Sequence, residues 1–119
     1  MFDKKKAIIC FQYVERIKSE LIIATKLLEK LDELEGDELA GAEKLMLSFL
    51  DALGGEVNIA HGVLGLRNFE EAGTKILEAK ELVLLHKYLD ATSRLSGAIS
   101  SVTTSGQRAM QMLKEKKLL

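Results

Sequence analysis

The sequence predicts an all-α protein: one domain over residues 1–119, folded as an antiparallel up-down-up-down four-helix bundle. Proline is absent, apolar residues recur every seven positions, and the breaks between apolar segments are short. Sustained spacing of this kind is typical of helices that pack against partners, and short connections join antiparallel neighbours. A chain of 119 residues has room for one modest core. We expect helices over about residues 4–34, 38–66, 69–90 and 94–116.

The first segment carries the clearest pattern. Two rows of apolar or small residues, each spaced by seven, form a continuous seam; they are Ala7, Val14, Leu21 and Leu28, and Cys10, Ile17, Ala24 and Leu31. Such a seam predicts a helix that buries one face. Asp3 is suited to cap its N-terminus, because a short acceptor side chain can bind the free N–H groups of the first turn. Gly36 is the expected stop at its C-terminus.

The second segment contains Gly54 and Gly55, which could break a helix. The spacing nevertheless continues through them. One row holds Leu39, Met46, Leu53 and Ala60, and the other holds Ala42, Phe49 and Val63, with Glu56 as the exception. Because the phase is the same on both sides of the glycines, we predict one continuous helix. A break at Gly54–Gly55 is the alternative.

A third helix is expected to begin at Asn68, because Glu71 follows three residues later as in a capping box. Its stripe is Phe69, Ala72, Ile76, Ala79 and Val83. From Leu84 the apolar face rotates, and a new seam holds Leu84, Tyr88, Ala91, Leu95, Ala98, Val102, Ala109 and Met112. A single helix to the end would be about 72 Å long and would outreach its partners. We therefore place a turn near Asp90–Arg94, with the Ser/Thr/Gly-rich run Ser100–Gly106 as the alternative break.

Composition restricts the class of protein. The longest apolar run, Ala7–Phe11, is far shorter than the roughly 20 residues that a membrane span needs, so no membrane partner is expected. Cys10 is the single cysteine, which favours a reducing, cytoplasmic location. A net charge of −1 provides no general attraction to nucleic acid. No pattern indicates a cofactor, a substrate or a small-molecule ligand.

Candidate catalytic groups are few. A di-iron bundle needs Glu-x-x-His on two helices, but Asn58 and Val83 stand three residues before His61 and His86. The carboxylate pair Glu78 and Glu81 could serve an all-α, magnesium-dependent nucleotide hydrolase, although no second pair follows on the last helix. A solvated helix face is the simpler interpretation of that pair.

Two further patterns depend on the bundle topology. Cys10 and His61 should lie at one level, where a thiol and an imidazole could form a nucleophile and its base; the alternative is a buried core cysteine. Charges should also gather at the two ends of the bundle. We call Lys4, Lys5, Lys6, Arg67, Lys114, Lys116 and Lys117 the basic pole, and Asp32, Glu33, Glu35, Asp37 and Glu38 the acidic pole. The basic pole is either a solubilising end or a weak polyanion binder.

The sequence also indicates an interface on the outer faces of the first two helices. Ile8, Ile9, Ile22 and Ile23 lie outside the core seam, and Gly41, Ser48, Gly55 and Gly62 form a stripe of small residues spaced by seven. Exposed apolar clusters mark interaction sites. We therefore expect a non-catalytic interaction or scaffold protein that forms a homodimer. In the alternative, the core extends over the isoleucines, and another helix of the same chain packs on the glycine stripe.

Overall fold

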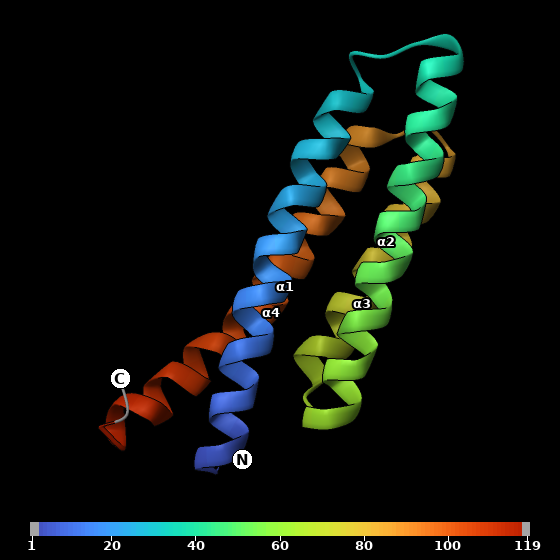
Figure 1. The fold of residues 1–119 in the computed structure, drawn as a ribbon. Coiled ribbons are helices and arrows are strands. Elements are labelled where there is room, and N and C mark those ends of the chain that lie inside the picture. Colours follow the sequence, from blue (N-terminus) through green and yellow to red (C-terminus); the bar gives the residue numbers. More distant parts are fainter. Residues whose placement is uncertain (1–2, 118–119) are drawn as a thin grey trace.

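The computed structural model describes residues 3–117, most of which belong to four helices. They are α1 (Lys4–Leu31), α2 (Gly36–Leu64), α3 (Arg67–Leu84) and α4 (Tyr88–Glu115). Figure 1 shows the helices running alternately in opposite directions, with both termini at the same end. The predicted all-α four-helix bundle is confirmed, and residues 3–117 contain no strand.

The helices form a ring in which each one packs against two others. Helix α1 contacts α2 and α4, and α3 contacts the same two helices from the opposite side. The bundle is a rod with extents of 54 × 22 × 18 Å. Its two ends are therefore well separated, and most of its surface is the outer faces of long helices (Figure 1).

Helix α1 agrees with the sequence pattern. All eight residues of the predicted seam are buried, and the Oδ1 atom of Asp3 accepts the N–H of Lys6 at 2.7 Å as an N-cap. The predicted role of Gly36 is wrong, because α1 ends five residues earlier at Leu31. The N–H groups of Glu33 and Leu34 bond back to the carbonyls of Lys30 and Leu31, and Gly36 instead begins α2 with a φ of +63°.

Helix α2 is continuous through Gly54 and Gly55, so the predicted continuity is confirmed and a break there is excluded. A Cβ at Gly54 would lie 3.8 Å from Ile76 of α3, which is ordinary contact. The second apolar row is wrong by one position: Leu50, Val57 and Leu64 are buried, whereas Phe49 is half-buried and Val63 is exposed. Consequently Glu56 does not lie in the centre of the core.

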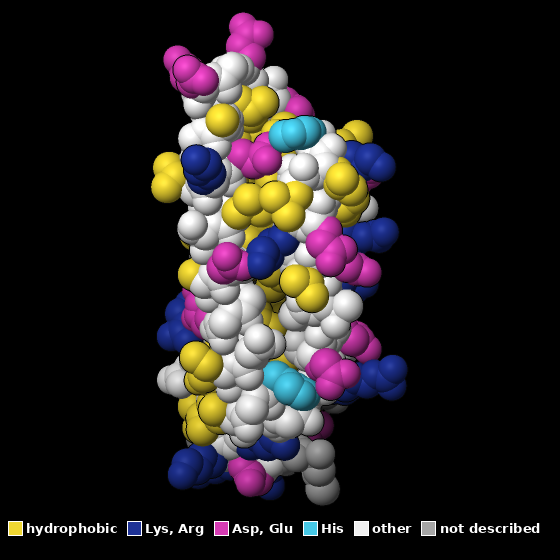
Figure 2. Space-filling view, turned by 90° about the vertical axis from the view of Figure 1, so that its right-hand side faces the viewer, with side chains coloured by type: hydrophobic (Ala, Val, Ile, Leu, Met, Phe, Trp, Pro, Cys, Tyr) yellow, Lys and Arg dark blue, Asp and Glu magenta, His cyan; other side chains and the backbone are white. Residues whose placement is uncertain are grey.

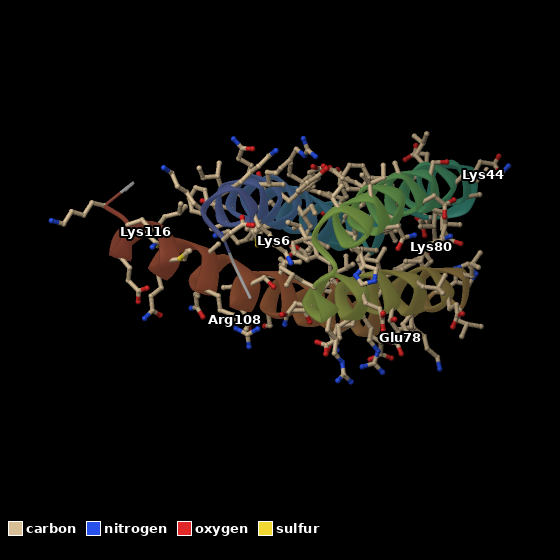
Figure 3. All side chains as sticks on the ribbon, turned by 90° about the horizontal axis from the view of Figure 1, so that it is seen from below. Lys6, Lys44, Glu78, Lys80, Arg108 and Lys116 are labelled. Carbon is tan, nitrogen blue, oxygen red and sulfur yellow. The ribbon has the colours of Figure 1, made fainter. Side chains whose placement is uncertain are left out.

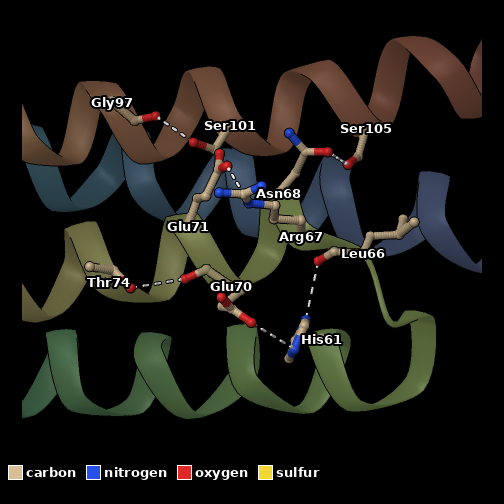
Figure 4. Close-up of polar contacts among 10 residues, drawn as sticks. All are labelled: His61, Leu66, Arg67, Asn68, Glu70, Glu71, Thr74, Gly97, Ser101 and Ser105. Atoms are coloured by element: carbon tan, nitrogen blue, oxygen red, sulfur yellow. Dashed lines mark hydrogen bonds and ion pairs between the residues drawn. The ribbon is translucent and has the colours of Figure 1, made fainter.

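The expected capping box at the start of α3 is absent. The helix begins at Arg67, and its N-cap residue, Leu66, makes no side-chain capping bond. Instead the Oδ1 atom of Asn68 accepts the hydroxyl of Ser105 at 2.9 Å. Asn68 therefore joins α3 to α4 (Figure 4). The five apolar residues predicted for this helix are all buried.

The turn between α3 and α4 lies at residues 85–87, not at Asp90–Arg94 as predicted. His86 has a left-handed φ of 60°. The N–H of Lys87 bonds to the carbonyl of Leu82, and that of His86 bonds to the carbonyl of Val83, both at 2.9 Å. This is the pattern of a Schellman ending, which usually has glycine at the left-handed position. Histidine occupies that position here, so the usual glycine stop signal is absent, and the rotation of the apolar face from Leu84 is the sequence feature that coincides with the turn.

The run Ser100–Gly106 is helical, so the alternative break there is wrong. Ser101, Ser105 and Gly106 are buried within α4. A Cβ on Gly106 would lie only 2.7 Å from a methyl group of Val14, which shows how closely α4 approaches α1. The small residues that resemble a loop by composition therefore allow tight packing between these two helices. Near the C-terminus, Leu113 is buried, and the predicted Met112 is half-buried.

Candidate interaction surface

Helix α2 carries a second apolar stripe on the side opposite the core. We call it the outer stripe; its members share the spacing of a helical face and are all exposed, namely Gly41, Leu45, Ser48, Ala52, Gly55, Ile59, Gly62 and Val63. The exposed fractions of Leu45, Ile59 and Val63 are 75%, 62% and 56%. The stripe contains no charged residue over about 33 Å of helix. A helix with apolar residues on opposite sides is usually covered by other helices on both of those sides. Helix α2, however, contacts only two neighbouring helices.

The glycines of the outer stripe face open space. A Cβ added at Gly41, Gly55 or Gly62 would meet no atom within 4 Å. No helix within residues 3–117 therefore packs on the glycines of this stripe, and that alternative from the sequence is wrong.

The four isoleucines of α1 lie on two different sides. Ile9 and Ile23 share a heptad position with Arg16, which pairs with Glu56 of α2, so they lie on the side toward α2. Ile8 and Ile22 share a position with Glu15, which lines a hollow together with residues of α4. Ile8, Ile22 and Ile23 are exposed, whereas Ile9 is half-buried against the core. Only Ile9 and Ile23 therefore adjoin the outer stripe.

The junction between α1 and α2 contains a polar cluster, which explains the exception at Glu56. Arg16 forms an ion pair with Glu56 and lies 3.9 Å from Glu20, and its guanidinium stacks 5.3 Å from the ring centre of Tyr13. Burial, together with the hydrogen bond to Glu56 and its negative charge, raises the pKa of Glu20 above its ordinary value, while Arg16 lowers it. Glu56 thus binds α1 to α2.

The bundle topology gathers the two charged poles as expected. The start of α1, which carries Lys4–Lys6, and the end of α4 lie at one end of the rod, and the start of α2 lies at the other (Figure 1). Figure 2 shows acidic side chains at one tip and basic side chains around the opposite end. The Lys4–Lys6 start of α1 lies at the end of the rod where α2 terminates, and the residue 32–38 segment joins α1 to the start of α2 at the other end (Figure 1).

The groove between α2 and α3 contains two sizeable hollows (Figure 2). Their volumes are about 450 Å³ and 410 Å³. Contacts between the two sides cross the groove: His61 lies 3.6 Å from Glu70, and Lys80 pairs with Asp51. The charged and imidazole groups that line the first hollow thus already have partners, and the second hollow is lined largely by apolar residues.

A compact hydrogen-bonded cluster closes the upper end of this groove. The hydroxyl of Tyr88 donates to Oε2 of Glu43 at 2.5 Å, and Nδ1 of His86 lies 2.9 Å from the same oxygen. Burial, then the hydrogen bond to Glu43 and its negative charge, raises the pKa of Tyr88 to about 12. Glu43 therefore ties α2 to the turn between α3 and α4, which is a sufficient structural role for these three residues.

Cys10 and His61 are not hydrogen-bonded to each other. The thiol of Cys10 is fully buried and lies 3.8 Å from the carbonyl oxygen of Ser105 in α4. Nδ1 of His61 lies 3.1 Å from the carbonyl of Leu66, to which it must donate, and its other nitrogen faces Glu70 (Figure 4). The proposed nucleophile and base therefore have separate partners, and Cys10 is a core residue.

We expect the thiol of Cys10 to react slowly in the folded protein. Burial raises its pKa from 9.0 to about 11, so at mildly alkaline pH the reactive thiolate is about 100-fold scarcer than in the unfolded chain. Ellman's reagent should therefore label the native protein at least about 100-fold more slowly than the protein in denaturant. Equal rates under the two conditions would show that the thiol is accessible.

The carboxylates Glu78 and Glu81, suggested for a magnesium site, lie on the exposed side of α3. Glu78 points away from the bundle (Figure 3), lies 3.8 Å from Arg94, and has Glu81 as an exposed neighbour on α3. Among residues 3–117, no group of three or more His, Cys, Asp or Glu side chains could hold a metal ion. None of the helices described is long and apolar enough to cross a membrane.

No family model, curated protein or solved structure matches this chain. The outer stripe of α2 is a feature of the described surface that contacts within residues 3–117 do not explain.

Proposed function

We propose that this chain is a non-catalytic interaction protein that self-associates through the outer stripe of α2 and the adjoining side of α1. One observation carries the proposal: α2 presents an uncharged apolar face to solvent over six turns of helix. Isolated exposed apolar residues are common on protein surfaces, but a contiguous face of this kind marks an interaction site. Ile9, Ile23 and the exposed Leu27 extend it onto α1.

The area of this face suits a weak dimer. A helix face about 33 Å long and about 12 Å wide provides roughly 400 Å² per partner. A stable interface buries roughly 800 Å² per partner, so α2 alone supplies about half. The side of α1 that carries Ile9, Ile23 and Leu27 is needed for the remainder. We therefore expect a dimer that dissociates in the micromolar range.

The decisive experiment places charge within the outer stripe. The double variant L45K/I59K should be monomeric by sedimentation equilibrium at micromolar concentration, because dimerisation would bury two unpaired ammonium groups in each copy. Both positions are exposed in the monomer, so far-ultraviolet circular dichroism should show unchanged helicity. The unmodified protein should be a dimer at the same concentration.

Two control variants test whether the effect belongs to this face. Leu89, 82% exposed at the start of α4, lies off the stripe, so L89K should remain dimeric. The double variant I8K/I22K, which changes the side of α1 nearer to α4, should also remain dimeric. An unmodified protein that is strictly monomeric, or an L45K/I59K variant that remains dimeric, would refute the proposal.

A further inference from the structure

We propose that the two copies meet in antiparallel orientation, with the basic pole of each beside the acidic pole of the other. This inference rests on the proposed self-association through the outer stripe and adds the geometry of the partner. Two independent features of the described residues support it. One is the placement of charge at the ends of the stripe, and the other is the order of large and small residues within it.

The two charged poles lie at the two ends of the rod, and the outer stripe runs between these ends. Acidic residues surround the start of α2, where the chain turns from α1, and the lysines of residues 4–6 lie at the end of the rod where α2 terminates (Figures 1 and 2). Between these ends the stripe is uncharged. The orientation of a second copy is therefore decided at the ends, where its own poles meet those of the first.

The length of α2 keeps the two poles of one copy far apart, so the parallel and antiparallel orientations differ clearly in their electrostatic contacts. Its 29 residues span about 43 Å, whereas charges are screened over about 8 Å at physiological ionic strength. Each pole thus acts only on the pole placed directly beside it. A parallel pair would bring the acidic poles together, and like charges in contact disfavour a partner. An antiparallel pair brings acidic and basic poles together at both ends.

The order of residues in the stripe favours the same arrangement. In an antiparallel pair centred on position 50, Leu45 of one copy faces Gly55 of the other, and Ile59 faces Gly41. Both contacts occur in one register, because 45 and 55, like 41 and 59, are equally distant from position 50. The glycines have open space above them, which can accommodate these side chains. In a parallel symmetric pair Leu45 would face Leu45, leaving glycine against glycine.

Crosslinking of cysteine variants tests the orientation directly. The variants G41C and G62C are made separately, one of them carrying a mass label, and are mixed and treated with a bismaleimide whose reach is about two helical turns. Positions 41 and 62 are about 32 Å apart along the same helix, so the two orientations give different products. We expect the mixed 41–62 product and little of the 41–41 or 62–62 products. Cys10 is buried and does not compete.

The possible results distinguish a failure of the antiparallel orientation from a failure of self-association itself. A dimer whose products are 41–41 and 62–62 overturns the antiparallel orientation but leaves self-association intact. A monomer at every concentration overturns both. If either cysteine itself dissolves the dimer, the flanking exposed pair K44C and N58C repeats the test. The dissociation constant of the antiparallel dimer should also rise with salt concentration. For a dimer with like poles side by side, the dissociation constant would instead fall as salt is added.

Discussion

Replacing Gly106 with alanine is expected to lower the free energy of unfolding by up to about 2 kcal/mol, although alanine is the better helix former. The new Cβ would lie 2.7 Å from Cγ1 and 3.4 Å from Cβ of Val14. These atoms belong to a short, stiff side chain in the core of α1, so the backbones of α1 and α4 must separate. Overpacking of this kind costs about 1–3 kcal/mol, against about 1 kcal/mol gained from helix propensity. Valine at the same position should cost more than about 3 kcal/mol.

The matched control is the same substitution at Gly54. Its Cβ would meet only a methyl group of Ile76, at 3.8 Å. G54A should therefore raise the free energy of unfolding by about 0.5–1 kcal/mol, and it does not touch the outer stripe. Urea unfolding followed by circular dichroism measures both variants. Combining G106A with V14A should recover part of the loss, because the two changes affect one contact. Equal effects of alanine at positions 54 and 106 would contradict the close approach of α1 and α4.

Alkaline pH is expected to destabilise the bundle through two buried groups. The pKa of Cys10 rises from 9.0 to about 11 and that of Tyr88 rises from 10.0 to about 12, in both cases chiefly because of burial. Between the unfolded and folded pKa values, the unfolded chain has released the proton and the folded chain still holds it. The folded state therefore loses relative stability as pH rises through each window, by at most about 3 kcal/mol per group.

Variants without the ionising group identify the contributions. Y88F should be less stable than the unmodified protein at neutral pH by about 1.5–2 kcal/mol, because it lacks the hydrogen bond to the Glu43 carboxylate. Its stability should then fall less steeply between about pH 10 and 12, so the two curves converge. C10A should flatten the curve between about pH 9 and 11 in the same way. Parallel curves for Y88F and the unmodified protein would contradict the raised pKa of Tyr88.

The boundaries of the helices show where local sequence signals fail. Glycine is the usual residue at the end of a helix, yet α3 ends on a left-handed His86. Ser/Thr/Gly composition is typical of loops, yet residues 100–106 are helical. In both places, contacts with residues far away in the sequence determine the local structure. Glu43 of α2 binds His86 at the turn, and Val14 of α1 packs on Gly106. A single-segment pattern contains neither contact.

The outer stripe, too, could be predicted only in part from the sequence. The spacing of Gly41, Ser48, Gly55 and Gly62 identified the stripe, but it could not tell whether the stripe faces a helix of the same chain or open space. That depends on the rotation of α2 about its own axis. The rotation is set by burial of Leu50, Val57 and Leu64 in the core in place of Phe49 and Val63. A shift of one residue rotates a helix face by about 100° and changes what is exposed.

The sequence by itself determined the helical class, the continuity of α2 and the core seam of α1, because each follows from a periodicity repeated over many turns within one segment. It also placed the charged poles, since short connections force neighbouring helices to alternate. The tertiary structure decided the ends of the helices, the separate surroundings of Cys10 and His61, and the exposure of the outer stripe. Those features depend on contacts between residues far apart in the chain, which compete with local preference and are absent from any single segment.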